Sequence, residues 1–109
     1  MLCLSIAHAQ DSIEKEKIQF LISSIENLPD AKFIRNGSEY DGKAAASHLR
    51  LKLKSVGDRV KTADDFIRMC ASQSSMSGKP YMIKFSDGKV VNSEDYFRTK
   101  LPEFKPGVQ

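Results

Sequence analysis

The sequence of 109 residues is poor in the side chains that usually hold metal ions. It has only two histidines, His8 and His48, and two cysteines, Cys3 and Cys70. Zinc needs three or four clustered ligands, and no run of acidic residues has the spacing of a calcium-binding loop. The sequence therefore predicts no metal site, and no motif indicates a cofactor.

Long apolar runs and blocks of like charge are absent too. A membrane-spanning helix needs about 20 consecutive apolar residues, and no such run occurs. The formal charge of +3 comes from 17 basic and 14 acidic residues that are interleaved along the chain. Because nucleic-acid binders usually concentrate basic residues on one face or tail, we predict neither a membrane span nor nucleic-acid binding.

The first nine residues, MLCLSIAHA, are apolar and uncharged. They end in Ala7-His8-Ala9, in which the two alanines form the A-x-A pattern of a secretory cleavage site, and polar Gln10 follows. We therefore expect residues 1–9 to be the remnant of a signal peptide that is cleaved after Ala9. The alternative is the frayed N-terminus of a cytosolic protein.

Helical periodicity and capping residues predict the helices. Apolar residues recur at helical spacing in four segments, and a residue that can cap a helix stands at the start of each. These segments and their caps are residues 12–28 with Asp11, 42–56 with Asp41, 63–72 with Thr62, and a short helix near residue 101 with Ser93.

Two turn signals predict the strands. Phe33-Ile34-Arg35 reads as a short strand before the turn signal Asn36-Gly37, and Asp87-Gly88 lies between two β-prone runs, which predicts a hairpin. The sequence thus predicts one α+β domain at residues 10–104, with three to four helices packed on a small antiparallel sheet. The sheet would consist of the hairpin and the Phe33 strand. Residues 105–109 should form a loose tail.

We expect one shared core that contains Leu49, Ile67 and Ile83. Without residues 1–9, Cys70 is the one remaining cysteine, so an internal disulfide is not possible. A lone thiol on an apolar helix face usually behaves as a small buried hydrophobe. The alternative, a reactive nucleophile, would need a cationic neighbour.

The polar loop at residues 73–80 is the best candidate for enzymatic chemistry. Ser74, Ser75 or Ser77 could act as a nucleophile with His48 as the base and Asp65 as its orienting acid. A small serine hydrolase acting on an ester or amide is therefore one hypothesis, although no G-x-S-x-G elbow is present. The alternative is that these serines end a helix and form turns by bonding the local backbone.

The second hypothesis is a non-catalytic binding module. Several polar residues fall near the ends of predicted elements, where side chains can converge on a groove and bind a carboxylate or phosphate. The alternative is that they pair with neighbouring acids and stay solvated. The predicted binding residues are Arg35, Asn36, His48, Arg50, Ser74, Ser75, Ser77 and Tyr81.

The segment from residue 33 to residue 81 resembles a family of small exported bacterial proteins, the YfeK-like family, a domain of unknown function. The residues that carry the resemblance are Phe33-Ile34-Arg35-Asn36-Gly37, Tyr40, Ala44-Ala45, His48-Leu49-Arg50, Lys52, Arg59, Thr62-Ala63, Asp65-Phe66-Ile67, Ala71-Ser72, Ser74-Ser75, Ser77-Gly78 and Tyr81.

The resemblance implies export to the periplasm and a single compact domain, and it brings no established activity. It also suggests that the 35–37 turn, His48, Arg50 and the serine loop belong to one common pattern. With the polar residues above, it leads us to expect a periplasmic protein that binds an envelope partner or a small anionic ligand.

Overall fold

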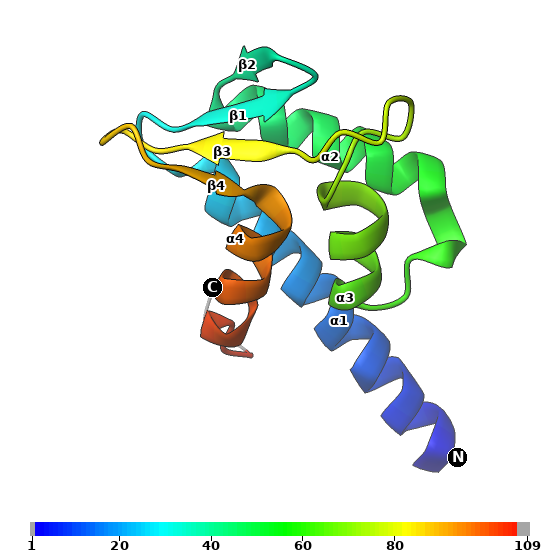
Figure 1. Ribbon diagram of the computed structural model, residues 1–109. Helices are drawn as coiled ribbons and strands as arrows, with labels where there is room; N and C mark the ends of the chain where they lie inside the picture. Colours follow the sequence, from blue (N-terminus) through cyan, green and yellow to red (C-terminus); the bar gives the residue numbers. More distant parts are fainter. Residues whose placement is uncertain (1, 107–109) are drawn as a thin grey trace.

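The computed structural model describes residues 2–106, with side chains from residue 11 onward. Within that part, four α-helices and a four-stranded antiparallel sheet form the molecule, which confirms the predicted α+β class (Figure 1). The α-helices are α1 (Leu2–Glu26), α2 (Gly42–Val56), α3 (Ala63–Phe66) and α4 (Ser93–Lys100). The strands are β1 (Lys32–Arg35), β2 (Ser38–Tyr40), β3 (Met82–Lys84) and β4 (Val90–Asn92). Short helical turns follow at η1 (Gly57–Arg59), η2 (Ile67–Ala71) and η3 (Leu101–Glu103).

The sheet has one more strand than the sequence predicts. Its order is β2-β1-β3-β4, with every neighbouring pair antiparallel. The extra strand, β2, pairs with β1 through a two-residue turn in which Asn36 has φ 50° and Gly37 has φ 83°. Positive φ at both positions is the geometry of a type I′ hairpin. The turn signal was therefore correct, and the strand after it was missed.

The cap predictions hold for two helices and fail for two. The Asp41 carboxylate accepts a hydrogen bond from the Ala44 N–H at 2.8 Å, and Thr62 forms a capping box at the start of α3. At α4 the prediction is wrong, because Asn92 is the cap and Ser93 is buried inside the first turn.

The first helix also begins earlier than predicted. Since α1 starts at Leu2, Asp11 lies within the helix and does not cap it. Glu14, three residues after Asp11, accepts a hydrogen bond from the Ala63 N–H at 2.8 Å and so stabilises the start of α3. The predicted signal-peptide remnant, residues 1–9, includes residue 1 and side chains that the structure does not describe, so it stays a prediction. The predicted loose tail, residues 105–109, also stays a prediction, because residues 107–109 lie outside the described part. Across residues 2–106, no helix combines the length and apolarity that crossing a bilayer requires.

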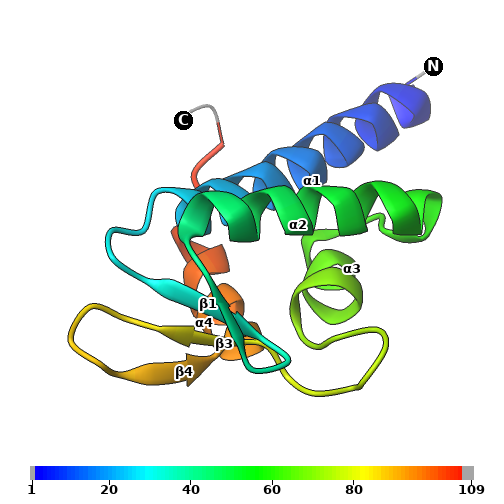
Figure 2. The same cartoon turned by 90° about the horizontal axis from the view of Figure 1, so that it is seen from above.

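One hydrophobic core joins the helices to one face of the sheet. Leu49, Ile67 and Ile83 are all fully buried in a single cluster, as predicted. Helices α1 and α2 lie side by side and run in opposite directions (Figure 2). On the sheet, α2 covers β1 and β2, whereas α4 covers β3 and β4.

The segment after α3 is not a regular α-helix, contrary to the prediction. Ile67–Ala71 forms a π-helix, and the Ser72 hydroxyl donates a hydrogen bond to the Ile67 carbonyl, five residues back, at 2.5 Å. Cys70 lies in this segment and is fully buried, and burial raises the pKa of its thiol. The predicted burial of Cys70 is confirmed, and an elevated thiol pKa disfavours nucleophilic chemistry.

Candidate functional site

Most of the predicted binding residues meet where α2 faces β1. Two adjoining depressions, of about 290 and 300 Å³, share Arg35, His48 and Leu51, and we call them together the α2–β1 site. The apolar half is also lined by Phe33, Tyr40, Ala44, Ala45 and Ser47. The polar half is also lined by Lys52, Ser55, Ser74, Ser75, Met76 and Tyr81.

The charge of the α2–β1 site is positive and uncompensated. No carboxylate lines either half, and within residues 11–106 neither Arg35 nor Lys52 forms a salt bridge. Arg35 is partly buried, and its Nε is a buried donor with no hydrogen-bond partner. Because a buried donor that lacks an acceptor costs free energy, Arg35 is poised to gain from an anion.

Lys52 is held in place by the loop that follows η2. Its Nζ donates hydrogen bonds to the Gln73 carbonyl at 2.8 Å and to the Tyr81 hydroxyl at 3.0 Å. The same ammonium lies 4.8 Å from the centroid of the Tyr81 ring, within cation–π range. Tyr81 is otherwise a core residue, packed on Phe33 with ring centroids 5.1 Å apart.

His48 lies between these two cations. Its Nε2 is 3.5 Å from the Tyr81 hydroxyl. Burial lowers the pKa of His48 below its ordinary value, and the positive charges of Arg35 and Lys52 lower it further. The imidazole is therefore mostly neutral at pH 7, and a bound anion would favour its protonation.

A hydrogen-bond network ties the β1–β2 turn to the serine loop. The Asn36 amide donates to Ser74 Oγ at 3.2 Å, and the Ser77 hydroxyl donates to Asn36 Oδ1 at 2.6 Å. Ser74 Oγ also accepts hydrogen bonds from the N–H groups of Met76 at 3.3 Å and Ser77 at 3.4 Å. Asn36 and Ser77 therefore adjoin the site through Ser74, and these bonds match the turn-forming role considered above.

The geometry gives little support to a Ser–His pair. Across the described side chains, no hydrogen bond joins a loop serine to His48. Ser74 is only 2 % exposed. Asp65, considered as the orienting acid, accepts hydrogen bonds from the Lys61 and Thr62 N–H groups and pairs with Arg68.

One predicted binding residue, Arg50, lies away from the site, and one cationic residue of the site, Lys52, was not predicted. Arg50 points to α1, where its guanidinium pairs with the Glu26 carboxylate at 2.8 Å, and it lines neither half of the site. Lys52 was not among the predicted binding residues. The available signal was its spacing, since a residue four positions after His48 on a helix lies on the same face.

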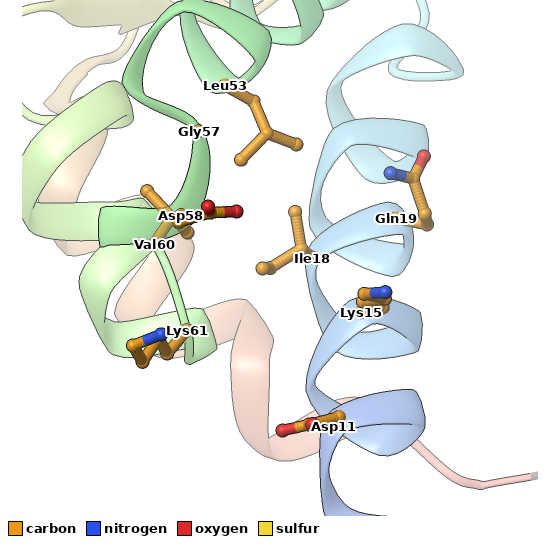
Figure 3. A pocket seen from close by; sticks show the side chains of 9 residues that line it. All are labelled: Asp11, Lys15, Ile18, Gln19, Leu53, Gly57, Asp58, Val60 and Lys61. Atoms are coloured by element: carbon orange, nitrogen blue, oxygen red, sulfur yellow. The ribbon is translucent and has the colours of Figure 1, made fainter. Parts of the chain in front are cut away.

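A larger depression, of about 600 Å³, lies between α1 and the end of α2 (Figure 3). Ile18 of α1 and Leu53 of α2 point into it, and exposed residues of both charges surround it. These are the carboxylates Asp11 and Asp58 and the ammonium groups Lys15 and Lys61. Because these opposite charges compensate one another, we place the candidate site at the smaller α2–β1 site, where the charge is not compensated. Within the described residues, no group of three potential metal ligands occurs.

Comparison with known proteins places this small α+β protein in a family whose function is not known. The chain belongs to a family described as a family of unknown function (DUF5329), which it matches over residues 12–105. It is 41 % identical over 68 residues to the uncharacterized protein YfeK of Salmonella typhimurium (strain LT2). That match spans 62 % of this chain and 57 % of the relative, so the chain covers less than two thirds of the relative's length. The resemblance to a YfeK-like family is thus confirmed, and no solved structure matches the chain.

Proposed function

We propose that this protein is an exported, periplasmic binding module that holds a small anionic ligand at the α2–β1 site without catalysis. The observation that carries the proposal is the convergence of Arg35, His48 and Lys52 on one depression that no carboxylate lines. Burial lowers the pKa of His48, and the positive charges of Arg35 and Lys52 lower it further, so the two cations repel a proton on the imidazole. A bound anion would remove that repulsion.

The chemistry of the three groups suits an anion of modest size. The Arg35 guanidinium offers a planar set of donors that can hold a carboxylate or phosphate through two parallel hydrogen bonds. Lys52 is already held by Gln73 and Tyr81, so little side-chain entropy remains to be lost on binding. Each depression, at about 300 Å³, is at the small end of the range for ligand pockets.

Titration with inorganic phosphate and with acetate, followed by NMR chemical shifts, tests the proposal. We expect saturable shifts centred on Arg35, His48 and Lys52. Replacing Arg35 with Gln should weaken binding about 10- to 150-fold, since a charge-assisted hydrogen bond contributes about 1.5–3 kcal/mol. The matched control is Arg59→Gln, because Arg59 is exposed on η1 and lines neither half of the site. Equal effects of the two variants, or shifts spread evenly over the surface, would contradict the proposal.

The serine hydrolase remains the alternative, and a serine-reactive fluorophosphonate tests it directly. Among the loop serines that line the polar half, Ser75 is exposed and Ser74 is buried, so Ser75 is the one more accessible to the reagent. Labelling of Ser75 in the native protein, and its loss in the His48→Gln variant, would favour the hydrolase. We expect no labelling, because Ser74 and Ser77 bond to Asn36 and to the backbone, and across the described side chains no hydrogen bond joins Ser75 to His48.

Export is tested separately from ligand binding. The full chain, expressed in a bacterium, should be recovered from the periplasmic fraction. N-terminal sequencing should then begin at Gln10, because Ala7 and Ala9 provide the small residues that signal peptidase requires. Recovery of the protein in the cytoplasm with Met1 intact would contradict this part of the proposal.

A further inference from the structure

We infer that the ligand of the α2–β1 site is an aliphatic carboxylate, that is, a carboxylate joined to a short apolar chain. This inference rests on the proposed function and adds the chemistry of the part of the ligand that carries no charge. The observation behind it is that the two halves of the site have different linings and share the same cationic residues.

The apolar half would accommodate the chain. Its walls come from Phe33 on β1, Tyr40 on β2 and the small residues Ala44 and Ala45 on α2. The two alanines leave room that larger side chains would fill. Since no lysine or carboxylate lines this half, an entirely ionic ligand such as free phosphate would leave it unused.

Exposed apolar side chains border the site. Leu51, shared by the two halves, is 68 % exposed, and Met76, in the polar half, is 92 % exposed. Among the described residues, these two and Val90 are the large hydrophobic side chains that remain exposed. Two of the three therefore border one site, and a ligand chain in the apolar half would remove part of the Leu51 surface from water.

The carboxylate would lie where the two halves meet. Arg35 and His48 line both halves, so a carboxylate that pairs with Arg35 has the apolar half directly beside it. The Arg35 guanidinium, which lines both halves, supplies the donors at this junction. The volume of about 290 Å³ for the apolar half favours a chain of a few carbons over a long acyl chain.

A series of straight-chain acids from acetate to hexanoate, titrated against the full chain, tests the inference. Affinity should rise about two- to fourfold for each added methylene, the range expected when methylene groups are buried, and hexanamide should not bind. The same chemistry occurs at the C-terminal residue of a peptide. N-acetyl-leucine is therefore compared with 4-methylpentanoate, and tighter binding of the former would identify peptide ends as the source of the carboxylate.

The variant Leu51→Asn tests the contribution of the ligand's apolar chain separately from that of its charge. It should flatten the dependence on chain length, so that hexanoate loses more affinity than acetate does, whereas Val90→Asn, at an exposed position that lines neither half of the site, should leave the whole series unchanged. If acetate and hexanoate bind equally to the wild-type protein, the inference is wrong and the proposed anion site stands. If neither the acids nor inorganic phosphate bind, the proposed function fails as well.

Discussion

Ser74 is the residue on which the serine loop depends most. It is nearly fully buried, and its hydroxyl oxygen accepts hydrogen bonds from Asn36, Met76 and Ser77. Ser74→Ala leaves these donors without an acceptor, so we expect a loss of about 1–3 kcal/mol in the free energy of unfolding. Ser75→Ala, at the exposed neighbouring position, should change it by less than about 0.5 kcal/mol. Urea unfolding measures both, and equal losses would contradict the assigned role of Ser74.

His48 should make the stability of the protein depend on pH. Burial, with Arg35 and Lys52, holds its pKa below the ordinary value, so the unfolded chain binds a proton more readily than the folded one. Stability should therefore be highest above the ordinary histidine pKa of about 6.5 and fall as the pH is lowered through the folded pKa. His48→Gln should reduce this dependence as the pH falls below about 7.5. An unchanged pH profile in urea unfolding would refute the assignment.

The same residue should report ligand binding. A bound carboxylate or phosphate adds a negative charge beside the imidazole, so it should raise the pKa of His48 toward or above its ordinary value. An NMR titration of the assigned His48 resonances, with and without saturating phosphate, measures this change. A pKa that is the same in both titrations would mean that the anion binds elsewhere.

The packing of α2 against α1 depends on a position without a side chain. A Cβ at Gly42 would collide with the Ile25 carbonyl oxygen and lie 3.0 Å from the Glu26 carbonyl oxygen. Gly→Ala in a helix usually stabilises by about 0.5–1 kcal/mol, whereas Gly42→Ala should destabilise by about 1–3 kcal/mol because α2 must move. Lys43→Ala, at the next and exposed position, is the control. Stabilisation by Gly42→Ala would show that the two helices are less closely packed.

The elements that could be predicted from sequence are those that local chemistry determines. Asp41 and Thr62 mark helix starts because a cap needs only a side-chain oxygen and the next turn. The strand Ser38–Tyr40 was missed because three mostly polar residues become a strand only through their pairing with β1. The early start of α1 was missed because Asp11, a good cap by type, also tolerates a position inside a helix.

The geometry of the candidate site could be anticipated from the sequence only in part. Arg35, Ser74 and Tyr81 lie near the ends of elements, as the sequence indicated, whereas His48 lies in the middle of α2. Arg50 was included because it is adjacent to this set in sequence, yet its position on α2 directs it to Glu26 of α1. The apolar lining, including Tyr40, comes from different elements, and no local pattern joins them.

One core includes residues of all four α-helices and of the sheet, so unfolding should be a single transition. Leu49 is fully buried in that core, whereas Leu51, two residues further along α2, is mostly exposed. Leu49→Ala should cost about 2–5 kcal/mol, and Leu51→Ala should cost less than about 0.5 kcal/mol. The urea dependence should keep the same slope in both variants. Two separate transitions, or equal losses, would contradict a single core.

The bonds from Asn36 to Ser74 and Ser77 have a consequence for how a ligand gains access. They connect the β1–β2 turn with Ser74, 38 residues later, in the serine loop, and both segments adjoin the α2–β1 site. Neither the turn nor the serine loop can move away from the other while these bonds persist. Entry and exit should therefore follow one local opening equilibrium, shared by the two segments, and hydrogen exchange at their amides should speed up or slow down together.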